Sequence, residues 1–153
     1  MSTDDLNSDP ADWDPQQDSE LEVVASVAAP IDQVFAAWST EMMPQWWWPM
    51  WDDVHYDFEP VPGRGWRIRT IEGGIGVHGE FIEVEDGEQL DFTWIWEGGH
   101  ADGSLRQESV TVKFSEFEDD TIVRVTQSAS DDEIDSLTDG WQDCLTRLEE
   151  LFD

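Results

Sequence analysis

Positive charge is scarce in this sequence. Seven Lys and Arg residues stand against 37 Asp and Glu among 153 residues, which gives a formal net charge of -30, and Lys113 is the only lysine. Proteins bind nucleic acid through basic side chains that displace counterions from the phosphates. Anionic membrane surfaces repel so acidic a protein. The composition therefore argues against nucleic acid and membrane as partners.

Cysteine is almost absent, and so is any long apolar run. Cys144 is the only cysteine, which excludes an internal disulfide and fits a reducing compartment. The first 20 residues lack the positive and apolar regions of a signal peptide, and no apolar run has the length of a membrane span. We therefore expect a cytoplasmic protein.

The carboxylates are spread through the N-terminal segment, the turns, the strands and the last helix instead of forming one block. Repulsion within such a shell destabilises the fold at low ionic strength. At molar salt the Debye length falls to roughly 3 Å, and this repulsion is screened. We therefore expect a salt-adapted protein from a halophile that accumulates salt in its cytoplasm.

The order of the elements follows from the periodicity of the apolar residues. Residues 1–19 are polar, acidic and interrupted by proline, which predicts a flexible tail, and residues 20–153 are expected to form one domain. A strand is expected at 20–29, a helix from Pro30 to about residue 40, and a short second helix at 41–43 that Pro44 ends. Six strand-like runs follow, divided by turn residues: 54–60, 65–72, 76–85, 89–96, 108–117 and 121–128.

The end of the chain changes to the period of a helix. Ser130 and Glu133 have the spacing of a capping box. Apolar side chains then recur at three- and four-residue steps: Ile134, Leu137, Trp141, Leu145 and Leu148. Because this helix alone has a long apolar stripe, it is expected to cover the apolar face of the sheet. The predicted fold class is α+β, a curved antiparallel sheet of six to seven strands around a long C-terminal helix, with two short helices after the first strand.

Several segments, taken in order, resemble one known family. They are API-x-x-VF-x-AW at 29–38, the WWWP after it, PGRGWRIR, GEFIEVEDGEQLDFTW, SVTVKF and GWQDCLTRLEEL. They resemble the START-like (SRPBCC) superfamily, and within it the homologues of the activator of the heat-shock protein 90 ATPase, over about residues 20–153. The resemblance implies a helix-grip fold with a hydrophobic cavity between the sheet and the last helix. Members bind lipids, polyketides or hormones, some catalyse cyclisation, and the namesake stimulates a chaperone. Where relatives often have a histidine, near the end of the last strand, this chain has Gln127 or its neighbour.

Tryptophan is abundant, with ten residues in the chain, and four of them stand in the segment PQWWWPMW at 44–51. Three consecutive side chains cannot all face one way in a helix or in a strand. At least one of the three is therefore expected to face solvent, a cavity mouth or a partner. The cluster either closes the open edge of the core or forms part of the wall or lid of a pocket.

Other tryptophans fall on elements whose apolar faces should meet in the interior. Rigid indole rings are difficult to pack at native density, so they either form the core or line a pocket for a flat or greasy ligand. His78 is the one polar side chain expected to reach such a cavity, as a hydrogen-bonding group or a general base. The candidate ligand-binding residues are Trp47, Trp51, Trp66, His78, Trp94, Trp96 and Trp141.

Other motifs are weak indications of chemistry. The glycines of 74–79 spell G-x-G-x-x-G, but a strand-like run follows where a dinucleotide site needs a helix, so they predict a hairpin turn. The three histidines lack metal-site spacing and Cys144 lacks a nearby base, so no metal, cofactor or catalytic residue is expected. Gly140, inside the last helix, suggests a close backbone approach beside Trp141.

Three functions are compatible with these patterns. The first is binding of a hydrophobic or aromatic small molecule, without catalysis, in a cavity between the sheet and the C-terminal helix. The alternative is a protein–protein module such as a chaperone co-factor, which predicts an exposed tryptophan patch. The third is a cyclase- or hydrolase-like enzyme, which requires at least two polar groups converging inside the cavity.

Overall fold

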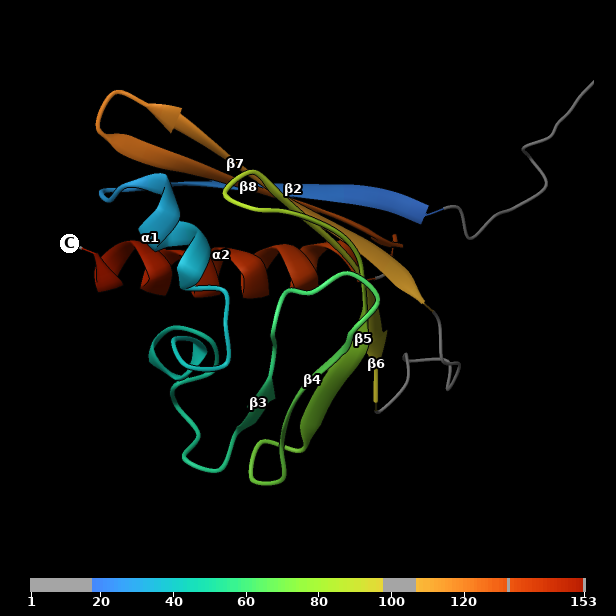
Figure 1. Cartoon of the computed structure of the whole chain (residues 1–153). Coiled ribbons are helices and arrows are strands. Elements are labelled where there is room, and N and C mark those ends of the chain that lie inside the picture. Colours follow the sequence, from blue (N-terminus) through green and yellow to red (C-terminus); the bar gives the residue numbers. More distant parts are fainter. Residues whose placement is uncertain (1–17, 98–106, 132, 153) are drawn as a thin grey trace, which may run out of the picture.

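Seven strands form one antiparallel sheet that curves around a long C-terminal helix (Figure 1). The computed structural model describes residues 18–97, 107–131 and 133–152. The sheet order is β2-β8-β7-β6-β5-β4-β3, and every neighbouring pair is antiparallel. The strands are β2 (Asp18–Val27), β3 (His55–Asp57), β4 (Gly65–Thr70), β5 (Ile75–Glu85), β6 (Gln89–Trp96), β7 (Glu108–Phe117) and β8 (Asp120–Ser130).

The helices complete the predicted helix-grip fold, which is confirmed. The α-helix α1 (Ile31–Ala36) and the 3-10 helix η2 (Met43–Gln45) follow β2, and α2 (Ile134–Leu151) ends the chain. Figure 1 shows α2 lying in the concave side of the sheet, with α1 beside it. None of the helices in the described part of the chain has the length and hydropathy of a membrane span.

The local structure corrects three expectations about where helices begin and end. The first helix ends at Ala36, about four residues early. Pro44 lies within η2 instead of ending a helix, because proline is tolerated in the first turn, where its missing N–H would have no partner. The expected capping box does not form, since Ser130 is the last residue of β8, and its hydroxyl donates to the Glu133 side chain at 3.3 Å.

Buried residues alternate along the two central strands, as expected for strands with one apolar face. Leu90, Phe92 and Trp94 alternate as buried residues along β6, and Val110, Val112 and Phe114 do so along β7. The start of β2 at Asp18 lies two residues before the predicted domain, and the rest of the predicted tail lies outside the described residues.

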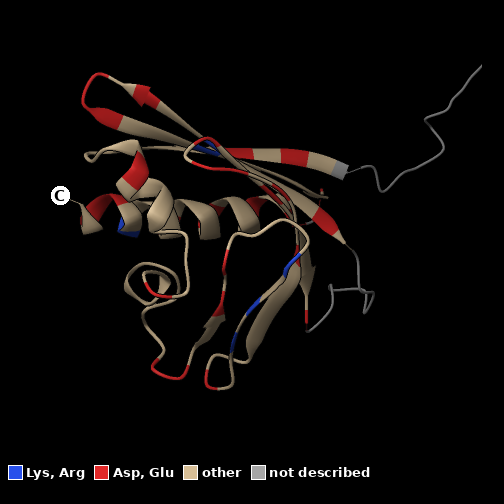
Figure 2. Ribbon diagram, in the orientation of Figure 1, with Lys and Arg blue, Asp and Glu red and all other residues tan. Residues whose placement is uncertain are grey.

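Carboxylates cover the turns, the strands and the helices, as Figure 2 shows in red. The positive side chains are few, and three of the seven Lys and Arg residues, Arg64, Arg67 and Arg69, lie within or directly before β4. The acidic shell is therefore a property of the whole described surface and not of one segment.

Candidate ligand-binding cavity

A cavity of about 270 Å³ lies between the Trp46–Trp51 loop, the ends of β5 and β6, and the first half of α2. Its walls are mostly aromatic. The lining residues are Trp47, Trp48, Ile75, Trp94, Trp96, Ser136, Leu137, Gly140, Trp141 and Cys144.

Three buried indoles form the floor of the cavity. Trp47 comes from the loop, Trp94 from β6 and Trp141 from α2, and each is at most 3 % exposed. The ring centroids of Trp47 and Trp141 are 5.3 Å apart, those of Trp94 and Trp141 5.6 Å, and those of Trp47 and Trp94 6.1 Å. These distances are those of aromatic rings in contact. The floor is therefore one packed aromatic cluster built from three separate elements.

The loop that holds Trp47 is fastened to the neighbouring elements. The Tyr56 hydroxyl on β3 donates to the Trp47 carbonyl at 2.5 Å, and Arg147 Nε on α2 donates to the Trp46 carbonyl at 3.0 Å. Burial raises the pKa of Tyr56 to about 12, so this hydroxyl keeps its proton at neutral pH. The backbone of Trp46 and Trp47 is thus held by hydrogen bonds from side chains on two elements, β3 and α2.

Half-buried side chains form the rim. Trp48 contacts Trp47 at a centroid distance of 6.1 Å and Trp51 at 5.8 Å, and its φ of 54° lies in the left-handed region that non-glycine residues rarely adopt. Trp96 contacts Trp94 at 5.3 Å. The run of three tryptophans is therefore divided: Trp46 closes the core, Trp47 belongs to the floor and Trp48 to the rim.

The indole N–H groups differ in their partners. Trp46 donates to the Ala37 carbonyl at 2.9 Å, Trp66 to the Thr93 carbonyl at 3.1 Å, and Trp141 to Gln127 Oε1 at 2.7 Å. Within the described residues, the buried indole nitrogens of Trp47 and Trp94 have no hydrogen-bond partner, and neither has that of Trp38. Buried donors are nearly always paired, so these three unpaired indole nitrogens, each shielded from solvent and from the cavity, are an unusual feature.

The structure brings four of the seven predicted ligand-binding residues to the cavity: Trp47, Trp94, Trp96 and Trp141. Trp51 lies outside it, against Gly73. Trp66 packs in the core against Phe58 and Phe92, with centroids 5.3 and 5.4 Å away.

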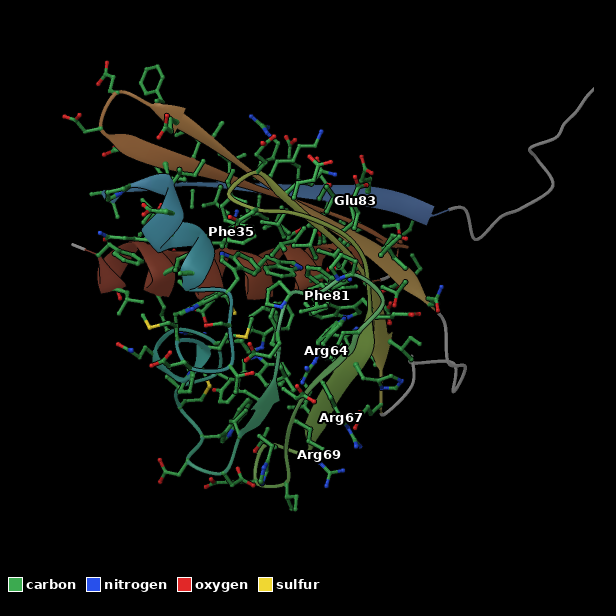
Figure 3. The ribbon with its side chains drawn as sticks, in the orientation of Figure 1. Phe35, Arg64, Arg67, Arg69, Phe81 and Glu83 are labelled. Carbon is green, nitrogen blue, oxygen red and sulfur yellow. The ribbon has the colours of Figure 1, made fainter. Side chains whose placement is uncertain are left out.

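His78 lies on the opposite face of the sheet. It is the cross-strand neighbour of Arg67, which points outward, and its Nδ1 is 3.1 Å from Glu97. Arg67 Nε donates to Glu97 at 2.6 Å, and this hydrogen bond lowers the pKa of Glu97. Figure 3 shows Arg64, Arg67 and Arg69 in a row along β4. His78 thus belongs to an outer polar cluster and not to the cavity.

Six lining residues were not predicted: Trp48, Ile75, Ser136, Leu137, Gly140 and Cys144. The last four lie on α2, whose helical period carries a signal for its inward face. Leu137, Trp141 and Cys144 follow at four and three residues, which places them on one helix face. Gly140 and Ser136, four apart, form the neighbouring rim. The expected close approach at Gly140 is wrong, because a Cβ added there meets no atom within 4 Å.

Cys144 is a buried and neutral part of the wall. Burial raises the pKa of its thiol to about 11, and Arg147 Nη2 lies 3.9 Å from the sulfur. A thiol with this pKa is a poor nucleophile at neutral pH. Among the described residues, no three His, Cys, Asp or Glu side chains are placed to hold a metal ion; His100 lies outside them.

The comparisons with known proteins agree with this fold. The family model described as "Activator of Hsp90 ATPase homolog 1-like protein" matches residues 28–153. No curated protein matches the chain. Among solved structures, DynU16, from the dynemicin biosynthetic locus, is 24% identical with a TM-score of 0.72 over 86% of this chain, which spans only 46% of DynU16.

Two further structures are similar at full length or nearly so. MLL2253 from Mesorhizobium loti is 20% identical, with a TM-score of 0.74 over 87% of this chain and 96% of its own. CalU16 from Micromonospora echinospora is 18% identical, with a TM-score of 0.67 over 89% and 77%. At these identities the likeness shows a shared fold.

Proposed function

The chain belongs to the family of activator of Hsp90 ATPase homolog 1-like proteins, and on that premise we propose that it binds a small apolar or aromatic molecule in the cavity between sheet and α2. The observation that carries the proposal is the aromatic floor. Three packed indoles leave a space of about 270 Å³ above them, of a size for a ligand of one or two rings.

The floor supports a ligand that is held by apolar contact. Trp47 and Trp94 both line the cavity, but their indole nitrogens are buried away from its space and have no partner within the described residues. The rings, and not their N–H groups, are therefore the surface that a ligand meets.

The polar groups of the wall favour binding over catalysis. Among the described lining residues they are one hydroxyl, on exposed Ser136, and one buried thiol, on Cys144. The thiol is protonated at neutral pH because burial raises its pKa to about 11. This is a poor set of groups for acid–base or nucleophilic chemistry.

Gly140 offers a direct test, since it lines the rim and an added Cβ there meets no neighbour. Gly140→Leu should fill the mouth of the cavity, whereas the matched control Gly140→Ala should leave it open. Neither change should destabilise the helix, because alanine and leucine both have a higher helix propensity than glycine. Quinoline, a neutral two-ring molecule with one acceptor nitrogen, serves as the probe in calorimetric titration.

The wild type and Gly140→Ala are expected to bind quinoline with similar affinity, and Gly140→Leu at least about tenfold more weakly. The thermal midpoint of each variant, measured in the same buffer, shows that the fold is intact. If Gly140→Leu bound quinoline as tightly as the wild type, or if the wild type did not bind quinoline, the result would count against the proposal.

The proposal extends to the setting: a salt-adapted cytoplasm, as in a halophile. Its support is the net charge of -30 together with the spread of carboxylates over the described surface (Figure 2). The dependence of stability on salt is the measurement that tests it.

A protein–protein function is the second candidate, because apolar side chains are exposed near the cavity loop. Met50 is 54% and Ile71 79% exposed, and Asp53 ties their two loops together by accepting from the Ile71 N–H at 2.9 Å. A chaperone of the Hsp90 class is the partner that the family suggests. Stimulation of its ATPase by the wild type, lost in a Met50→Asp/Ile71→Asp variant, is the expected result; no stimulation by the wild type would remove the candidate.

A further inference from the structure

The cavity continues into a more polar groove. A hollow of about 510 Å³ lies between the glycines of the β4–β5 turn and the start of α2. It shares four lining residues with the cavity: Ile75, Trp96, Ser136 and Leu137. The two hollows are therefore adjacent, an aromatic inner chamber and an outer groove with a shared border at Trp96.

The charge along this path is of one sign. Among the described residues that line the two hollows, there is no Lys, Arg or His, and Glu133 is the one carboxylate. Cys144 contributes no charge at neutral pH. The surrounding protein has a formal net charge of -30, which attracts cations and repels anions wherever salt does not screen it.

The N-terminus of α2 would by itself favour an anion, because of the helix dipole. Here two carboxylates already lie at this end of the helix: Glu133 is the N-cap residue and Asp135 lies in the first turn. Their negative charges offset the partial positive charge of the helix end. The groove therefore presents negative and not positive potential to a ligand.

The rings of the chamber prefer the same sign of charge. Five of the ten cavity-lining residues are tryptophans, and tryptophan has the aromatic face that attracts cations most strongly. The attraction increases when the cation is shielded from water, as it would be against the half-buried ring of Trp96. Trp141 has its N–H bonded to Gln127 and so offers a ligand its ring alone.

We propose that the occupant of this site is an organic cation, a flat apolar body with a permanent positive charge. The body occupies the aromatic chamber, and the charge lies at the border with the groove, near Trp96 and Glu133. This inference rests on the proposed function, because it specifies the charge of the molecule that the cavity binds.

Three probes of nearly equal shape test the inference: N-methylquinolinium as the cation, 1-methylnaphthalene as the neutral form and 1-naphthoate as the anion. Each is titrated calorimetrically into the wild-type chain in molar KCl, where long-range attraction is screened. The cation is expected to bind at least about tenfold more tightly than the neutral probe, and the anion most weakly.

Two variants locate the preference. Trp96→Leu keeps an apolar wall without a ring, and Glu133→Gln keeps the shape without the charge; each should reduce the ratio of cation to neutral affinity. Glu116→Gln, on an exposed residue of β7, is the matched control and should leave the ratio unchanged. Thermal midpoints confirm folding of all three.

The outcomes separate the two proposals. If the neutral probe binds as tightly as the cation, or if neither variant changes the ratio, the inference is overturned while small-molecule binding stands. If none of the three probes binds, the proposed function itself fails, and the inference fails with it. A cation preference that Trp96→Leu and Glu133→Gln both reduce supports it.

Discussion

The indole N–H of Trp141 donates to Gln127 Oε1 at 2.7 Å, and the Gln127 amide in turn donates to Glu108 Oε1 at 3.2 Å. All three side chains are buried. The orientation of one cavity wall is thus held by a polar side chain on β8 that does not itself touch the cavity. Satisfied polar contacts of this kind make a buried arrangement specific.

Removing that contact should destabilise the fold. Gln127→Leu leaves the buried Trp141 N–H without its acceptor, and we expect a loss of about 1–3 kcal/mol in the free energy of unfolding. Urea unfolding of Gln127→Leu, Trp141→Phe and the double variant forms a double-mutant cycle. The two losses should be less than additive; strictly additive losses would show that the two side chains are not coupled.

Gly79 should tolerate no side chain. A Cβ there would lie 2.0 Å from the Thr93 carbonyl oxygen and 2.7 Å from Trp66 Nε1, so Gly79 makes room for the indole that bonds to Thr93. Gly79→Ala must displace backbone and is expected to cost about 3 kcal/mol or misfold. Gly140→Ala is the matched control, expected to stabilise by up to about 1 kcal/mol. Equal thermal midpoints of the two variants would contradict this account.

Asp53 should stabilise the protein in a pH-dependent way. It accepts hydrogen bonds from the Thr70 hydroxyl and from the Ile71 and Glu72 N–H groups, and these lower its pKa below the ordinary 3.8. A carboxyl whose folded pKa is lowered stabilises the fold fully above its unfolded pKa and loses that effect as pH falls through the folded value.

The comparison is between the wild type, Asp53→Asn and the exposed control Asp52→Asn, by urea unfolding at pH 6 and pH 3. The loss in free energy of unfolding caused by Asp53→Asn should be clear at pH 6 and smaller at pH 3. Asp52→Asn should cause little loss at either pH. If the loss caused by Asp53→Asn were larger at pH 3 than at pH 6, the pKa of Asp53 would be raised in the folded state and not lowered.

Salt should stabilise the chain strongly. With a formal net charge of -30, repulsion between carboxylates opposes folding in dilute buffer, and molar KCl reduces the Debye length to roughly 3 Å. The thermal midpoint should rise by about ten degrees or more, on the order of 3 kcal/mol or above, from dilute buffer to molar KCl. Equal midpoints would refute the salt-adapted setting.

The sequence predicted four of the cavity-lining residues, three of them tryptophans on regular elements. Alternation along β6 gave the inward faces of Trp94 and Trp96, and the helical period of α2 gave Trp141.

His78 was misplaced although its own strand carries the signal. Val77 and Phe81 are buried on one face of β5, and alternation puts His78 on the other face. Its cross-strand neighbour Arg67 also points outward.

The loop was the part that sequence reasoning could not resolve. The division of Trp46, Trp47 and Trp48 depends on tertiary contacts from Tyr56 and Arg147 and on a left-handed backbone at Trp48. No local pattern encodes these contacts. Periodicity therefore predicts the walls made by strands and helix, whereas the wall made by a loop follows from the packed structure.

The most direct test of ligand binding in the cavity observes the indole N–H groups themselves by ¹H–¹⁵N NMR during titration with quinoline. The Trp47 and Trp94 signals, assigned by Trp→Phe substitution, are predicted to shift because a bound quinoline ring lies against their indole rings. The signals of Trp46 and Trp66, already bonded to Ala37 and Thr93, should stay in place. Unmoved Trp47 and Trp94 signals at saturating quinoline would contradict the account.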